Sequence, residues 1–145
     1  MKFRKSISYQ LARINTAHKT ALERSMNEIG LHSGQVFVLL ELWKHDGQRQ
    51  VDLAARLNIA PPTVNKTLKG LIDSGFVTRT KVEDDARSTR IFLTQKGVDI
   101  EEGVRTQWER LEEELLARLT DTEMLVLFQL LEKLGPEDVD SANED

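Results

Sequence analysis

The stretch Glu83–Thr94, with the sequence EDDARSTRIFLT, places an acidic turn before a short apolar segment and sets Arg87 and Arg90 close to the acids. Extended segments at 76–82 and 89–93 flank the turn, and this pattern predicts a β-hairpin. A plain hairpin tip does not require charges of both signs at this density. The tip is therefore a candidate binding element, and the segments around it indicate its partner.

Helical spacing of apolar residues dominates the rest of the chain. It predicts helices over residues 3–29, 34–45, 50–57, 61–74, 94–119 and 122–134. The first of them is predicted from residues that recur at alternating steps of four and three, namely Ile7, Leu11, Ile14, His18, Ala21 and Ser25. The expected fold is mostly α, with one two-stranded β-hairpin.

Residue types at the ends of these segments support the predicted helices. Ser33 is a candidate N-cap of the second helix, in which Val36–Leu40 is apolar on every side and is therefore expected in the core. Inward-facing positions of the third helix are expected at Val51, Ala54 and Leu57. Pro61 suits the first position of the fourth helix, because its missing N–H has no partner there. Thr120–Glu123 fits a capping box for the last helix.

The composition is that of a globular chain, with 145 residues of which 39% are hydrophobic and 30% charged. The longest apolar runs, 36–40 and 124–128, are too short to span a membrane, and no apolar segment follows the basic N-terminus as in a signal peptide. Cysteine is absent. This excludes disulfides, cysteine metal sites and thiol chemistry, and it fits a cytoplasmic protein.

Charge is distributed unevenly along the chain, although the net charge is only −4. Residues 1–94 carry 15 Lys and Arg against 9 Asp and Glu, whereas residues 95–145 carry 5 against 15. Such asymmetry suggests that the first region meets an anion and that the second presents a solvated acidic surface.

The order helix, short helix, helix, strand, turn, strand is that of a winged helix-turn-helix, whose later helix enters the DNA major groove. Four polar residues lie off the inward stripe of the fourth helix and are candidate DNA contacts: Thr63, Asn65, Lys66 and Lys69. Lysine can donate to guanine, asparagine can pair with adenine, and threonine can donate to phosphate. For this helix alone, a solvated surface is the alternative.

The hairpin and the helices before it carry a further set of motifs. Asp85–Arg87, followed after five residues by Leu93–Thr94, matches D-x-R-x-x-x-x-x-L-T. Together with Val51–Leu57, Pro62–Lys66 and Leu71–Arg79, this segment resembles the MarR family of bacterial transcription regulators. In that resemblance the three upstream segments correspond to the first motif helix, the recognition helix and an L-x-x-x-G-x-V-x-R segment. The resemblance covers nearly the whole chain.

The resemblance implies a single domain over residues 1–136, with the winged helix-turn-helix at about 31–94 and dimerisation helices at about 3–29 and 95–134. It implies a cytoplasmic homodimer that binds an inverted-repeat operator in double-stranded DNA and acts as a repressor. No cofactor, membrane contact or metal is expected. Residues 137–145 are acidic and are expected to form a disordered tail.

The resemblance also implies roles for residues of the hairpin. The arginine matching Arg87 enters the minor groove, whose negative potential favours it, and the aspartate matching Asp85 holds the wing in shape. We expect Arg79 to pair with Asp84 or Asp85, and Arg90 to face solvent. Residues expected to anchor the wing to the body are Ile91 and Leu93.

Three positions depart from the family pattern. Ala60 stands where the family commonly has Ser, and Asn65 and Lys66 stand where it often has Ser and Arg. Loss of a capping hydroxyl costs up to about 1 kcal/mol of helix stability. The other two departures affect the expected operator sequence and leave the expected fold unchanged.

A regulator of this family is expected to respond to a ligand between its dimer helices and its winged lobe. Thiol oxidation is excluded as the signal because cysteine is absent. Arg13 and His18, with Trp43 or Trp108, are candidate residues for binding an aromatic carboxylate through ion-pair and cation–ring contacts. The alternative is that both tryptophans are core residues.

Other functions remain as alternatives. Because the three histidines fall in different segments and the G-x-S-x-G, P-loop and HExxH motifs are absent, we do not expect an enzyme. Glu41 and His45 have the i,i+4 spacing of zinc ligands, with His18 as a third, which would make a metal-responsive regulator of the same fold. An ion pair at the helix end is the alternative for this pair. A winged helix that binds protein instead of DNA is a third possibility, which Arg87 and the lysines disfavour.

Overall fold

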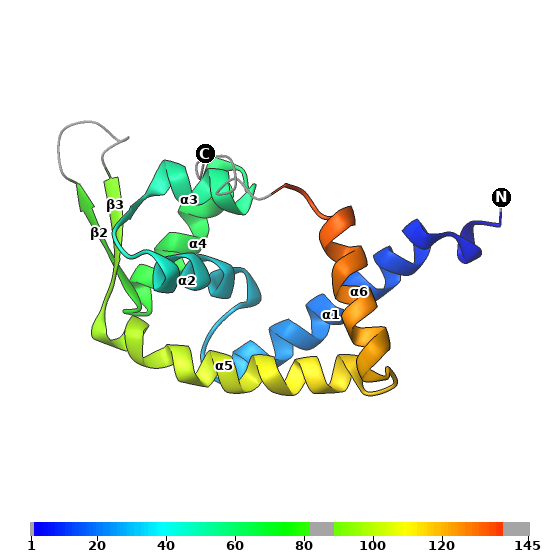
Figure 1. Ribbon diagram of the computed structural model, residues 1–145. Helices are drawn as coiled ribbons and strands as arrows, with labels where there is room; N and C mark the ends of the chain where they lie inside the picture. Colours follow the sequence, from blue (N-terminus) through cyan, green and yellow to red (C-terminus); the bar gives the residue numbers. More distant parts are fainter. Residues whose placement is uncertain (1, 82–88, 138–145) are drawn as a thin grey trace. The chain divides into compact units, whose positions relative to one another are not determined.

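The structure is a computed structural model that describes residues 2–81 and 89–137. Its contacts divide the chain into two compact units, residues 1–111 and 112–145. In chain order the elements are η1 (Phe3–Lys5), α1 (Ile7–Asn27), α2 (Ser33–Lys44), β1 (Gln48–Arg49), α3 (Gln50–Leu57), α4 (Pro61–Asp73), β2 (Val77–Lys81), β3 (Thr89–Leu93), α5 (Gln95–Leu116) and α6 (Asp121–Leu134) (Figure 1). The predicted mostly α, winged helix-turn-helix fold is confirmed.

Helix α2 forms the centre of the first unit, where it contacts α1, α3, α4 and β3. Its Val36, Leu39 and Leu42 are fully buried. The prediction that Val36–Leu40 is buried on every side is wrong for Phe37 and Leu40, which are 40% and 39% exposed. These two side chains face α5, and Leu40 borders an open hollow there, so the neighbouring helix does not cover them completely.

Helix α1 begins at Ile7 instead of residue 3. Ser6 ends a separate 3-10 turn and caps α1, because its hydroxyl accepts the N–H of Tyr9 at 3.2 Å. Within the first unit α1 buries only residues near its end, Leu22 and Met26. The earlier apolar stripe is exposed, and Ile7 reaches 71%. This leaves half of the helix without an apolar partner in its own unit.

The junction between α1 and α2 is held by one carboxylate. Glu23 accepts the backbone N–H of Ser33 at 2.7 Å and lies 2.7 Å from Nδ1 of His32. The prediction that Ser33 caps α2 is therefore wrong, because Ser33 is the first helical residue and its N–H is bound by a side chain from α1. The hydrogen bonds to His32 and Ser33 lower the pKa of Glu23 from 4.5 to about 2.

We expect this junction to make the protein sensitive to acid. Since the pKa of Glu23 is lower in the folded state, its contribution to stability is complete above about pH 4.5 and is lost as the pH falls towards 2. The effect should be small, because the Glu23 side chain is 39% exposed. Glu23→Gln should therefore reduce the loss of melting temperature between pH 5 and pH 3, measured by circular dichroism. The exposed substitution Glu113→Gln should not.

The turn between α3 and α4 depends on a left-handed residue. Asn58 ends α3 with φ of 50°, a conformation that asparagine tolerates better than most residues. The N–H of Ile59 then bonds to the carbonyl of Ala54 at 3.1 Å, which closes the end of α3. The prediction that Val51 faces inward is wrong, since it is 45% exposed, and Leu53 is the buried residue of this turn of the helix.

The sheet has three antiparallel strands in the order β1–β3–β2, so the predicted two-stranded hairpin is extended by one strand. In the register, Arg79 lies opposite Ile91 on one side, and Gln48 lies opposite Ile91 on the other. Ile91 is fully buried, as expected for a residue that anchors the wing. Arg90 is exposed as predicted, but it also donates to the carbonyl of Gly47 at 2.8 Å, which helps to hold β1 against β3.

Helix α5 is fixed to the sheet at its first turn. Thr94 accepts the N–H of Gly97 at 3.1 Å and donates to the carbonyl of Gly75 at 2.6 Å. Gly97 packs so closely on the backbone that a Cβ there would lie 2.1 Å from the carbonyl oxygen of Phe76. The indole N–H of Trp43 donates to the Gly97 carbonyl at 2.9 Å. Sheet, α2 and α5 therefore meet at one glycine.

The second unit contains the end of α5 and helix α6. The predicted capping box is confirmed, because Thr120 and Glu123 exchange side chain to backbone hydrogen bonds of 3.1 and 3.2 Å. The bounds of α5 and α6 differ slightly from the predicted 94–119 and 122–134. Large apolar side chains exposed on α6 are Leu125, Val126, Leu127, Phe128, Leu130, Leu131 and Leu134. In the described part of the chain, no helix has the length and apolar character needed to cross a membrane.

Candidate nucleic-acid interface

Helix α4 separates its apolar and polar residues onto opposite sides. The buried side consists of Val64, Leu68 and Leu71. The four candidate DNA contacts are all exposed: Thr63, Asn65, Lys66 and Lys69. The predicted orientation of the helix is therefore confirmed, and the buried stripe fixes it against the body of the lobe. That these four residues contact DNA stays a prediction.

The N-terminus of α4 offers no free backbone donor. Pro61 and Pro62 have no N–H, and the N–H groups of Thr63 and Val64 both bond to the carbonyl of Ala60, at 2.9 and 3.2 Å. Ala60 makes no side-chain cap, as its departure from the family pattern implies. A phosphate at this end must therefore be bound by side chains, and the exposed Thr63 hydroxyl is placed there.

Asn65 is oriented by residues from two other elements. Its Oδ1 accepts from Nη2 of Arg79 at 3.1 Å and from Nε2 of Gln50 at 3.4 Å. Arginine can only donate, so the atom of Asn65 that faces Arg79 is the amide oxygen. Both lone pairs of that oxygen are then occupied, and the amide NH₂ remains as a donor.

This contact changes the role expected of Arg79. The sequence predicted a pair with Asp84 or Asp85, and both acids lie outside the described residues, as does Arg87. The described bond joins Arg79 to Asn65. Gln50 was missed by the sequence analysis, because a residue at the start of a short helix carries no pattern that indicates a contact 15 positions later.

The exposed side chains around α4 and the wing are largely cationic. Lys66, Lys69, Arg79 and Lys81 are all exposed. Arg49 is paired with Asp52 at 2.9 Å, and its hydrogen bond lowers the pKa of that carboxyl. The carboxylate of Asp52 is therefore already neutralised by arginine, and the exposed lysines and Arg79 give this surface a positive charge suited to phosphates.

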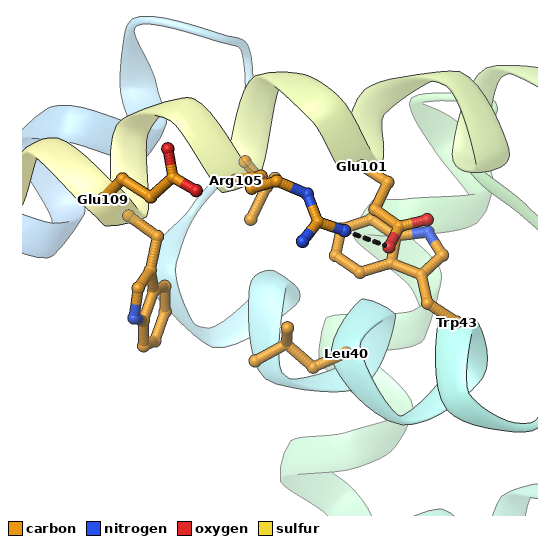
Figure 2. Close-up of a pocket in the computed structure, with 7 residues that line it drawn as sticks. Leu40, Trp43, Glu101, Arg105 and Glu109 are labelled. Atoms are coloured by element: carbon orange, nitrogen blue, oxygen red, sulfur yellow. Dashed lines mark hydrogen bonds and ion pairs between the residues drawn. The ribbon is translucent and has the colours of Figure 1, made fainter.

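The four candidate ligand residues fall in two places. Trp43 and Trp108 line a hollow of about 450 Å³ between α2 and α5 (Figure 2). Arg13 instead lies on α1, 6.0 Å from the ring centre of Tyr9, and lines a separate shallow hollow. His18 is half-buried on α1. Neither Arg13 nor His18 lines the tryptophan hollow of the same chain.

The Glu41 and His45 pair is joined through the backbone, where the His45 N–H bonds to the Glu41 carbonyl at 3.0 Å. Among residues 2–81 and 89–137, no group of three or more His, Asp or Glu side chains is placed to hold a metal. His45 is the residue that ends α2.

Comparison with known proteins agrees with this geometry. Residues 31–89 match the model of the MarR family. The uncharacterised HTH-type transcriptional regulator YdgJ of Bacillus subtilis is 29% identical over 128 residues, which cover 88% of this chain and 76% of that protein. Residues 31–89 therefore form a MarR-family domain.

Two further proteins extend the comparison. The HTH-type transcriptional repressor Mb2911 of Mycobacterium bovis is 26% identical over 89% of this chain and 93% of its own. The fold also matches a mutant MarR of E. coli crystallised with operator DNA, with a TM-score of 0.82 at 24% identity, over 94% of this chain and 99% of that one. Together with the MarR-family match over residues 31–89, these relatives indicate a DNA-binding transcription regulator.

Proposed function

We propose that the protein is a non-enzymatic, homodimeric repressor that binds an inverted-repeat operator through α4 and the wing, and that a small organic ligand releases it. The observation that carries the DNA-binding part is the polar, cationic face of α4, held outward by its buried stripe. Thr63, Asn65, Lys66 and Lys69 are proposed to contact the major groove and its phosphates. Arg87, supported by Asp85, is proposed to contact the minor groove.

Dimerisation is supported by apolar surface that neither unit covers within itself. On α1 this surface includes Ile7, and on α6 it includes Phe128 at 62% exposure. Burial of such side chains contributes about 25 cal/mol per Å², which favours association of two copies. Repression is supported by the name of the Mycobacterium relative.

Operator binding is tested by selection of bound fragments from genomic DNA. We expect an inverted repeat with half-site centres about one helical turn apart. Affinity should fall steeply between 50 and 200 mM salt, because each phosphate contact releases a counterion and 6–10 contacts lower affinity by roughly 10³- to 10⁵-fold. Fluorescence anisotropy with the selected operator and with a scrambled duplex measures both effects. Equal affinity for the two duplexes at physiological salt would refute a sequence-specific regulator.

Arg79→Ala is expected to change base preference more than affinity. With Arg79 bound to Asn65, the asparagine offers only its NH₂ group. That group can donate to any base edge that carries an acceptor, so several bases should be tolerated. Without Arg79, one lone pair of the amide oxygen becomes free, so the side chain can both accept and donate and can pair with adenine, a contact worth about 1–3 kcal/mol of discrimination. Competition between operators that differ at single base pairs measures the shift, which should appear at one position in each half-site.

Thr78→Ala is a matched control for that experiment, since Thr78 is exposed on the same strand. An identical preference in the Arg79→Ala and wild-type proteins would show that Asn65 is not oriented by the wing when DNA is bound. A metal-responsive or protein-binding winged helix is a weaker proposal, because the described residues bring together no group of three or more potential metal ligands and the exposed face of α4 is cationic.

A further inference from the structure

The hollow between α2 and α5 has apolar walls. Leu40 and Trp43 reach it from α2, and Val104 and Trp108 reach it from α5 (Figure 2). Its volume of about 450 Å³ is in the range of sites for small organic ligands. All of its lining residues belong to the first unit, so the hollow is formed without the second.

The two indoles are held in place but remain partly open. The Trp43 N–H is bound to Gly97, and the Trp108 ring meets the Phe37 ring edge to face, with 6.2 Å between centroids and an angle of 82°. Both tryptophans are nevertheless only half-buried. Their exposed ring surfaces border the hollow, and tryptophan is the side chain whose ring attracts a cation most strongly.

The rim of the hollow carries more negative than positive charge. Glu101, Arg105 and Glu109 lie along one side of α5, and Arg105 extends towards Glu101 and away from Glu109 (Figure 2). The Arg105 guanidinium lies 3.1 Å from the Glu101 carboxylate and 3.7 Å from that of Glu102. In the part of the chain that the structure describes, the carboxylate of Glu109 has no ion pair or hydrogen bond.

We infer that this hollow binds an aromatic cation, such as an aryl amine in its protonated form. The ring would lie between the two indoles, and the cationic group would face Glu109. An aromatic carboxylate fits less well, because the one arginine at the rim is already neutralised by two carboxylates. The inference rests on the proposed release by a small organic ligand and names the class of that ligand.

The position of the hollow explains how a ligand there would act on DNA binding. At Gly97, α5 is fixed to the sheet and to α2. The hollow lies one to three turns further along α5, between the same two helices. A ligand in it would therefore change the angle at which α5 leaves the winged lobe, whereas the fixed first turn would act as the pivot.

Three probes with the same ring separate charge from shape: 1-naphthylmethylammonium, 1-naphthalenemethanol and 1-naphthylacetate. Isothermal titration calorimetry on the full chain at pH 7 and constant ionic strength should show the ammonium binding about tenfold more tightly than the alcohol, with the acetate weakest. If the acetate bound most tightly, Arg105 would govern the site and the inference would be wrong. Absence of binding by all three would also overturn it.

Two variants locate the binding. Glu109→Gln should remove most of the preference for the ammonium over the alcohol, whereas Glu113→Gln, which makes the same change of charge on the same helix outside the hollow, should leave it intact. Equal effects of the two variants would show that the preference comes from the overall acidity of α5 and would contradict a site at the hollow.

Operator binding in the presence of the same probes distinguishes this inference from the proposed function. Weaker operator binding with the ammonium, abolished by Glu109→Gln, would support both. Binding of the ammonium without release of the operator would support the ligand class and contradict release through this hollow. If the free protein bound no operator at all, the proposed function would be wrong, whereas the calorimetric preference would still decide the ligand class.

Discussion

Replacing both Phe128 and Leu131 with lysine is expected to convert the protein to a monomer and to weaken operator binding by roughly a hundredfold or more. Both side chains lie exposed on α6, three positions apart, within its apolar surface. In the proposed dimer this surface is buried, and two charges there would have to be desolvated without partners. A monomer binds one half-site and loses the effective concentration that the second provides.

Light scattering measures the mass, and fluorescence anisotropy measures operator affinity. The matched control is Thr122→Lys with Gln129→Lys, which adds the same charge to exposed polar positions of α6. Circular dichroism should show that the helices persist in both variants, because neither touches the buried core of the first unit. A Phe128 and Leu131 variant that stays dimeric and binds as tightly as wild type would remove α6 from the dimer interface.

Gly97→Ala is expected to destabilise the protein by about 3 kcal/mol or more and to lower its melting temperature by on the order of 10 °C. The added Cβ would lie 2.1 Å from the Phe76 carbonyl oxygen and 3.2 Å from Cδ2 of Leu93. The nearest atom belongs to the backbone, so no side-chain rotation relieves the overlap. Relief requires α5 to move off the sheet, which would break the 3.0 Å bond from Thr94 N–H to that same carbonyl.

Gly103→Ala is the control on the same helix. A Cβ at position 103 meets nothing closer than 3.8 Å, at Cδ1 of Ile100 and of Ile29. Alanine also stabilises a helix by up to about 1 kcal/mol relative to glycine. This variant should therefore be as stable as wild type or more stable in thermal unfolding. If the Gly97→Ala protein had the same melting temperature as the Gly103→Ala protein, the first turn of α5 would be loosely packed.

Local sequence patterns were sufficient for much of this fold. The stripe of α4 was predictable because helical period alone places Val64, Leu68 and Leu71 on one side, and the capping box at Thr120 depends on residues three positions apart. The alternation of β3 was predictable for the same reason. Each of these features is decided within one element.

The features that were missed depend on contacts between elements. Ser33 resembles an N-cap, yet its N–H is bound by Glu23 from another helix. β1 has only two residues, too few to show an alternating pattern of apolar and polar residues. The exposure of Phe37 depends on the path of α5, which the sequence of α2 does not encode. Among the candidate site residues, orientation on α4 was predictable, whereas the Arg79 to Asn65 bond was not, and contact with DNA stays a prediction.

The bond between Arg79 and Asn65 has a consequence for how such a regulator diverges. After gene duplication, one copy can lose binding to the original operator by changing the residues that face the DNA major groove. Here a substitution at position 79 would alter what Asn65 presents while the sequence and packing of α4 stay intact. Because Arg79 is exposed on an edge strand, such a change costs little stability. If Asn65 contacts the operator as proposed, new operator preferences would be accessible by single substitutions outside α4.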